Sequence, residues 1–208
     1  MIAEGTESPV GIFGHSQGGW VTIEAAGRGA PIAFAVTSSG PGLTPAAQER
    51  YSASRALEQA GVSPERMDHA MRDFDAIVSM LREGVSLDGA RARVEAAGLG
   101  DAFNELDMPF LPNDPAEWDL VRALFDYDPR PALERIRVPL LALFGGDDAV
   151  VPVEESVAVY REAVRSGLLT VAVFEGADHR VQTGDPPRPA EGYLETVSSF
   201  VAASAGVS

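Results

Sequence analysis

Residue types that can act together in covalent catalysis stand far apart in this chain: a serine among glycines, an aspartate and a histidine. Ser16 lies in the stretch GHSQG, between Gly14 and Gly18. A serine hydroxyl becomes an effective nucleophile when a base removes its proton, and a carboxylate commonly orients that base. The fold must therefore bring a histidine and a carboxylate to this serine if it is to react.

The pattern G-x-S-x-G is typical of a serine on a strained turn between a strand and a helix, where flanking side chains would clash. The apolar run Val10–Phe13 predicts a strand before this turn, and residues 17–27 predict a helix after it. A phosphate or dinucleotide loop is the other interpretation of such a turn. It is disfavoured because the chain has no G-x-G-x-x-G and no acidic residue ends the next strand.

The chain has three histidines, and His179 is the expected base. It lies in FEGADHRV, just past the apolar run 168–174, at the carboxyl end of a predicted strand, where parallel sheets build their sites. His15 adjoins the serine, and we expect its side chain to point elsewhere and support the turn. His69 falls within an amphipathic helical pattern and is expected to be a surface or packing residue.

The stretch LFGGDDAVVP supplies two candidate carboxylates, Asp147 and Asp148, directly after the apolar run 138–144. A carboxylate at this place can fix the tautomer of His179 and stabilise its imidazolium. An aspartate after a strand often only caps a helix or forms a turn. The residue pattern alone leaves both aspartates open.

The composition excludes several other classes of protein. A net charge of −15 repels nucleic acid and anionic lipid, so neither is an expected partner. All sixteen cationic residues are arginine, which excludes Schiff-base, P-loop and pyridoxal chemistry at a lysine. Cysteine is absent, which excludes thiolate nucleophiles and thiolate metal sites. We expect no cofactor, no metal and no membrane span. The protein is predicted to be cytoplasmic, because no secretory signal is visible.

Four short runs are almost continuously apolar, which is typical of strands covered by helices on both faces. They are residues 10–13, 32–37, 138–144 and 168–174. Helical patterns follow the first, third and fourth runs, as right-handed crossovers require. The sequence therefore predicts an α/β fold with a parallel sheet.

About ninety residues separate the second and third runs, far more than one crossover helix needs. We expect a helical insertion there. Five apolar residues from Met67 to Leu81 recur at helical spacing and predict one of its helices. Residues 88–97 and 116–125 predict two more.

These features together resemble the C-terminal two-thirds of an α/β-hydrolase, with details similar to bacterial esterases and acyl-peptidase-like hydrolases. The matching segments are GHSQGGW, SSGPG, YDPRPALERIRVPLLALFGGDDAVVPVEES and VFEGADH. The resemblance implies a triad in the chain order Ser16, Asp148, His179. It favours Asp148 over Asp147, because in relatives the triad aspartate precedes a short x-V-V-P. It also implies that the N–H of Gln17 donates to the oxyanion.

The same resemblance implies a hydrolase core over residues 1–41 and 131–208 and a helical cap over residues 42–130. The implied activity is hydrolysis of a small-molecule carboxylic ester through an acyl-enzyme. A peptidase acting on small peptides and a catalytically impaired fragment stay open as alternatives. The expected partner is a small-molecule ester or acyl substrate.

The resemblance also predicts an N-terminal truncation, because family members have several strands before this serine. Fewer than ten residues precede Val10 here. The second oxyanion donor then has no source in the chain. The strand at Val10–Phe13 is expected to expose an apolar edge, which a missing segment or a second copy in a homo-oligomer would cover.

Overall fold

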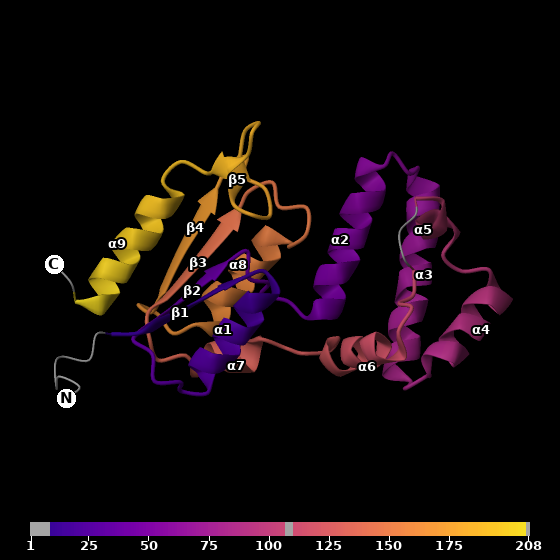
Figure 1. The fold of residues 1–208 in the computed structure, drawn as a ribbon, viewed down its shortest axis with the longest axis horizontal. Coiled ribbons are helices and arrows are strands. Elements are labelled where there is room, and N and C mark those ends of the chain that lie inside the picture. Colours follow the sequence, from indigo (N-terminus) through magenta and orange to yellow (C-terminus); the bar gives the residue numbers. More distant parts are fainter. Residues whose placement is uncertain (1–8, 107–109, 207–208) are drawn as a thin grey trace, which may run out of the picture. The chain divides into compact units, whose positions relative to one another are not determined.

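The structure is a computed structural model that describes residues 9–106 and 110–206 (Figure 1). Its chain forms two compact units. The first takes in Met1–Leu43 and Asp128–Ser208, and the second takes in Thr44–Tyr127. The candidate site lies wholly within the first unit, so the two units are described separately. That residues 42–130 act as a cap over the site stays a prediction.

The first unit is built on a parallel sheet of four strands in the order β1-β2-β3-β4. The strands are β1 (Gly11–His15), β2 (Phe34–Ser38), β3 (Leu140–Gly145) and β4 (Leu169–Phe174). Each strand begins slightly after the start of its apolar run. At β3 the cause is Pro139, which has no N–H to donate to a ladder. The prediction of a parallel α/β sheet is confirmed.

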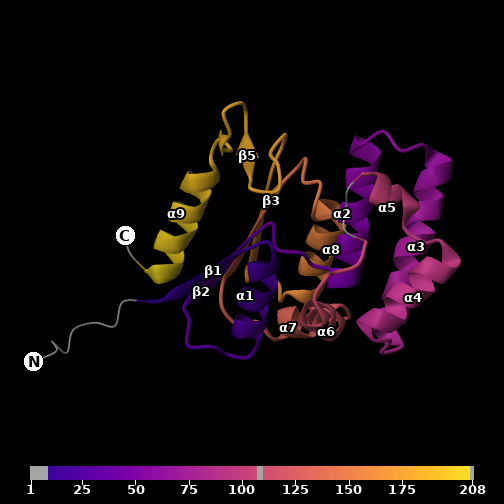
Figure 2. The ribbon, with the colours of Figure 1, turned by 45° about the vertical axis from the view of Figure 1, so that its right-hand side comes forward.

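Helices cover both faces of this sheet, as Figures 1 and 2 show. On one face lie α1 (Gln17–Gly27), α7 (Arg130–Arg135) and α8 (Val153–Ala163), and on the other lies α9 (Tyr193–Ala205). Successive strand residues point to opposite faces. Ala35 therefore packs in the cluster that contains residues of α1, α7 and α8, whereas Phe34 packs against α9. This double covering explains why the strands read as continuous apolar runs.

Strand β1 lies at the end of the described sheet and pairs with β2. Phe13 in this strand is 53% exposed, and Val10 just before it is 65% exposed. The apolar residues here are thus far more accessible than those of β2 and β3, whose side chains are buried. A short antiparallel pair, β5 (Gln182–Thr183) and β6 (Arg188–Pro189), follows β4 and was not predicted.

The second unit consists of helices in the part of the chain that the structure describes. They are α2 (Pro45–Gln59), α3 (Pro64–Arg82), α4 (Leu87–Ala97), α5 (Asp101–Glu105) and α6 (Pro115–Leu124). The three helices expected here are confirmed as α3, α4 and α6. The predicted apolar stripe of α3 packs inside this unit, where Met71, Val78 and Leu81 are buried. No helix among the described residues is both long and apolar enough to cross a bilayer.

Candidate active site

Ser16 occupies a strained turn between β1 and α1. Its φ of 54° and ψ of −123° lie in a region that non-glycine residues rarely adopt, at a cost of about 1–3 kcal/mol. Two backbone hydrogen bonds hold the turn in this conformation. The N–H of Ser16 donates to the carbonyl of Ser38 (2.9 Å), and the N–H of Gly19 donates to the carbonyl of Ser16 (2.8 Å). The hydroxyl is therefore presented by a backbone fixed to the end of the neighbouring strand β2.

The glycines around this turn have different roles. A Cβ on Gly14 would lie 2.0 Å from the carbonyl oxygen of Gly18, and a Cβ on Gly19 would lie 2.5 Å from the Cα of Gly40. A Cβ on Gly18 meets no described atom within 4 Å. The expectation that both glycines flanking the motif avoid a clash is therefore wrong for Gly18. The space is needed at Gly14, and at Gly19 because the SSGPG segment packs against the start of α1.

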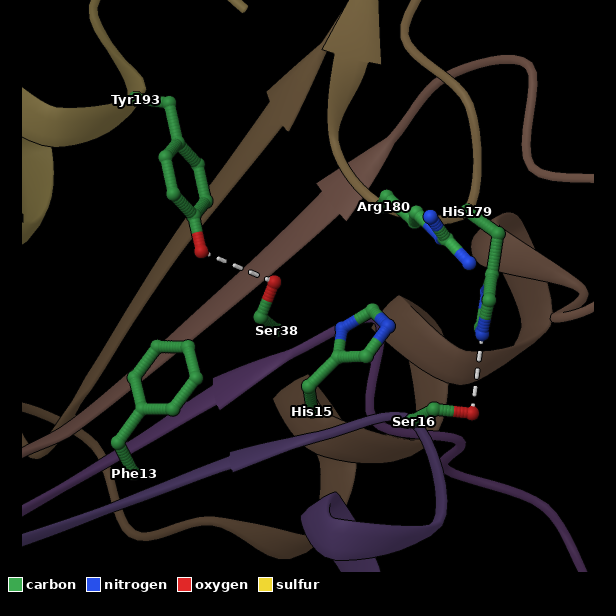
Figure 3. Close-up of a pocket in the computed structure, with 7 residues that line it drawn as sticks. All are labelled: Phe13, His15, Ser16, Ser38, His179, Arg180 and Tyr193. Atoms are coloured by element: carbon green, nitrogen blue, oxygen red, sulfur yellow. Dashed lines mark hydrogen bonds between the residues drawn. The ribbon is translucent and has the colours of Figure 1, made fainter. Parts of the chain in front are cut away.

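Asp148 and His179 follow β3 and β4, and the structure brings them together. The carboxylate oxygen Oδ2 of Asp148 lies 2.8 Å from Nδ1 of His179. A carboxylate only accepts hydrogen bonds, so Nδ1 is the protonated nitrogen of a neutral His179. Its other nitrogen, Nε2, then carries a lone pair and lies 2.9 Å from Oγ of Ser16 (Figure 3). The three side chains form one continuous hydrogen-bonded chain.

Backbone donors fix the carboxylate of Asp148. Its Oδ1 accepts the N–H groups of Val150 (2.8 Å) and Val151 (2.9 Å), which leaves Oδ2 directed at His179. The Asp148 side chain is fully buried. Its neighbour Asp147 is exposed, and its backbone N–H donates to the carbonyl of Ala177 (2.9 Å). Of the two aspartates, Asp148 is the one that the structure places against His179.

Ser16 and His179 open into a pocket of about 590 Å³, and both line it (Figure 3). The other lining residues are Phe13, His15, Ser38, Arg180 and Tyr193. The Tyr193 hydroxyl donates to the Ser38 hydroxyl (3.2 Å) on the wall opposite Arg180. Sequence reasoning did not single out Phe13, Ser38, Arg180 or Tyr193. The place of Arg180, next in the chain to the expected base, was the available signal.

The expectation that His15 points away from the site is wrong. Its ring centroid lies 5.0 Å from that of His179, and Figure 3 shows the side chain in the pocket. The reason is that β1 continues to His15, and alternation places His15 on the same face as Phe13. Partial burial and then the nearby imidazole of His179 lower the pKa of His15. A neutral imidazole is thus favoured beside the expected base.

The two remaining residues of interest lie where their sequence positions suggest. Gln17 is the first residue of α1, so its N–H is one of those that the helix itself leaves unpaired. His69 lies on α3 in the second unit, largely exposed and 3.7 Å from Asp73. No group of three or more histidine, aspartate or glutamate side chains within residues 9–106 and 110–206 is arranged to hold a metal ion.

Comparison with models of known protein families shows which family the chain belongs to. A model of the alpha/beta hydrolase family matches residues 2–193. The chain belongs to this family. In this α/β-hydrolase, the matched residues include Ser16, Asp148 and His179 and most of the described fold. A comparison with curated proteins finds no match.

Several solved structures have a similar fold, and three of them are VinJ, an esterase domain and a monoacylglycerol lipase. VinJ matches this α/β-hydrolase with a TM-score of 0.54 and 18% identity over 94% of this chain and 66% of its own. The esterase domain of a Rhodothermus marinus protein has a TM-score of 0.50 and 14% identity over 93% and 60%. The monoacylglycerol lipase of Paleococcus ferrophilus has a TM-score of 0.50 and 20% identity over 95% and 68%. The chain therefore spans about two thirds or less of the length of VinJ and the esterase domain and shares their fold.

Proposed function

We propose that this α/β-hydrolase cleaves carboxylic ester bonds of small molecules through an acyl-enzyme formed on Ser16. The observation that carries the proposal is the hydrogen-bonded chain from Ser16 Oγ through His179 to the buried Asp148. A nucleophile within reach of a base, with that base oriented by a third group, is the geometry that acyl transfer needs.

In the first step, Nε2 of His179 takes the proton of the Ser16 hydroxyl as Oγ attacks the ester carbonyl carbon. The new Oγ–C bond turns the carbonyl oxygen into an oxyanion, and His179 becomes an imidazolium. The carboxylate of Asp148 stabilises that cation through Nδ1–H and keeps the ring oriented. The C–O bond to the alcohol then breaks, and His179 returns the proton to the leaving alkoxide.

The second half of the cycle uses the same groups. His179 takes a proton from a water molecule as that water attacks the acyl carbon. The bond between the acyl carbon and Oγ then breaks, and His179 returns the proton to Oγ, which releases the acid and restores the Ser16 hydroxyl. The N–H of Gln17 is assigned to the oxyanion, because it opens α1 immediately after the nucleophile and the helix dipole adds positive potential there. Each such donor contributes about 10²–10³ in turnover.

Labelling with a fluorophosphonate probe tests the nucleophile directly. Folded wild-type protein is expected to be labelled at Ser16, and Ser16→Ala is expected to be folded and unlabelled. Circular dichroism checks that both proteins are folded. Absence of labelling in folded wild-type protein overturns the assignment of Ser16 and favours the impaired-hydrolase alternative.

A substrate panel tests the bond that is cleaved. Hydrolysis of 4-nitrophenyl acetate and butyrate is compared with hydrolysis of aminoacyl 4-nitroanilides. We expect the wild-type protein to hydrolyse the esters and Ser16→Ala to have lost this activity. The 4-nitrophenolate of these esters leaves a tetrahedral intermediate without prior protonation, whereas the anilide nitrogen must first be protonated. An ester therefore demands less of the site. Turnover of the anilides alone would mean a peptidase and would refute the esterase proposal.

A further inference from the structure

The side chain of Arg180 stands in the candidate pocket beside the expected base. Arg180 follows His179 in the chain and lines the same pocket as Ser16 (Figure 3). Several other arginines pair with carboxylates, as Arg50 does with Asp75 and Arg82 with Asp126. Among the residues that the structure describes, no carboxylate and no carbonyl pairs with the guanidinium of Arg180.

The backbone that carries Arg180 is held firmly. The carboxylate oxygen Oδ1 of Asp178 accepts the N–H groups of Arg180 and Gln182, each at 2.9 Å. Val181 is fully buried and has a φ of 55°, a conformation that a β-branched residue rarely adopts. Its N–H donates to the carbonyl of Asp178 (2.9 Å), and its carbonyl accepts the N–H of Ala190 (2.9 Å). The loop therefore presents His179 and Arg180 together, in a fixed relation to Ser16.

The charge of Arg180 is not compensated within the pocket. The described lining consists of the two histidines, two hydroxyl-bearing serines, Phe13, Tyr193 and Arg180, and contains no acidic residue. The carboxylate of Asp148 is buried and has partners on both oxygens. The pKa of His15 is lowered by partial burial and by the nearby His179, which favours the neutral form of that ring. The positive charge of Arg180 thus faces the space that a substrate must enter, in a protein whose net charge is −15.

We propose that Arg180 binds an anionic group of the substrate, so that the preferred substrates are esters whose acyl chain ends in a carboxylate. This inference rests on the proposed ester hydrolysis at Ser16. A guanidinium offers a planar pair of N–H donors that matches a carboxylate, and such charge-assisted pairs are stronger than neutral hydrogen bonds. Because the overall field of the protein repels anions, selection of an anionic substrate requires a local cation of this kind.

Two esters that differ in one terminal group test the inference. Mono-4-nitrophenyl adipate carries a carboxylate where 4-nitrophenyl hexanoate carries a methyl group, and both release 4-nitrophenol. We expect kcat/KM for the adipate, relative to the hexanoate, to fall about tenfold in Arg180→Gln, mainly through KM. Arg188→Gln is the matched control, because Arg188 is exposed on β6 and does not line the pocket. Its ratio is expected to stay at the wild-type value.

The outcomes separate this inference from the proposed function. If Arg180→Gln leaves the adipate-to-hexanoate ratio of kcat/KM unchanged, because both values fall equally or neither falls, the anion site is overturned and ester hydrolysis stands. If the wild-type protein hydrolyses neither ester, the proposed function fails. Calorimetry with monomethyl adipate and the Ser16→Ala protein then decides on the anion site alone. Binding that Arg180→Gln abolishes in that background supports the site, and binding that does not depend on Arg180 overturns it.

Discussion

Replacing Asp148 by asparagine changes one atom of the candidate triad and nearly preserves its shape. Asp148 uses Oδ1 for the N–H groups of Val150 and Val151 and uses Oδ2 for Nδ1 of His179. An asparagine has one oxygen, and the two backbone donors require it. The amide NH₂ group must then face His179, where a carboxylate oxygen stood.

This arrangement inverts the roles of the two ring nitrogens of His179. Opposite an NH₂ group, Nδ1 has to accept, so a neutral ring carries its proton on Nε2. That N–H donates to Ser16 Oγ and cannot take its proton. We expect kcat for 4-nitrophenyl butyrate to fall about 10⁴-fold, or about 5 kcal/mol in activation free energy, as is usual when a triad carboxylate becomes an amide. Oxyanion stabilisation and substrate binding account for the remaining activity.

Stability separates this effect from a folding defect. Because Asp148→Asn keeps an acceptor for Val150 and Val151, its free energy of unfolding is expected to stay close to that of the wild type. Asp148→Ala instead leaves the N–H of Val151 buried without a partner, which costs about 1–3 kcal/mol. Urea denaturation measures both variants.

The matched control is Asp147→Asn, because Asp147 is exposed and does not contact His179. Its kcat is expected to stay within about twofold of the wild type, as for surface changes generally. A folded Asp148→Asn protein that keeps a tenth or more of wild-type kcat, or an equal loss in Asp147→Asn, would refute the assignment of Asp148 as the carboxylate of the site.

Three further predictions concern the residues around the nucleophile. Ser16→Gly and Ser16→Ala should both abolish ester hydrolysis. The free energy of unfolding of Ser16→Gly, measured by urea denaturation, should exceed that of Ser16→Ala by about 1 kcal/mol, because glycine adopts the positive φ without strain. Gly14→Ala should lower the melting temperature strongly, whereas Gly18→Ala should leave it unchanged or raise it. The reason is that, of these two positions, the added methyl group clashes at Gly14 and not at Gly18. Equal changes of melting temperature in the two variants would contradict the assigned clash. The lowered pKa of His15 means that the unfolded chain takes up a proton before the folded one as pH falls below the ordinary value of 6.5. Wild-type stability should therefore drop more between pH 7.5 and 5.5 than that of His15→Asn, and parallel pH curves from urea titrations would contradict this.

Patterns that depend on neighbouring residues in the chain were readable from the sequence. The apolar runs predicted all four strands of the described sheet, because helices pack on both of its faces and apolar side chains are therefore favoured on both. The serine turn was readable because the close approach of the Gly18 carbonyl to Gly14 requires a glycine two residues before Ser16. The helix α2 (Pro45–Gln59) was not, since its buried face is small and includes the polar Gln48, and so its apolar period is weak.

Features that depend on register or on distant contacts were not readable. Gly14 suggested that the first strand ends at Phe13, whereas it runs on to His15 and so turns that ring into the pocket. The requirement for Gly19 arises from Gly40, which is distant in sequence. The hydroxyl pair of Ser38 and Tyr193 joins the end of β2 to the start of α9 and carries no local pattern.

The sheet alone does not bring the three candidate residues together. Ser16 follows β1 and His179 follows β4, and three strand spacings separate these strands by about 14 Å. The 2.9 Å contact between Ser16 Oγ and His179 Nε2 therefore requires the loop after β4 to cross the end of β3. The space for this crossing is at Gly145, where a Cβ would lie 2.1 Å from the carbonyl oxygen of Asp178. Gly145 has no side chain and no chemical role, yet the contact between His179 and Ser16 depends on it because it leaves room for the loop that carries His179.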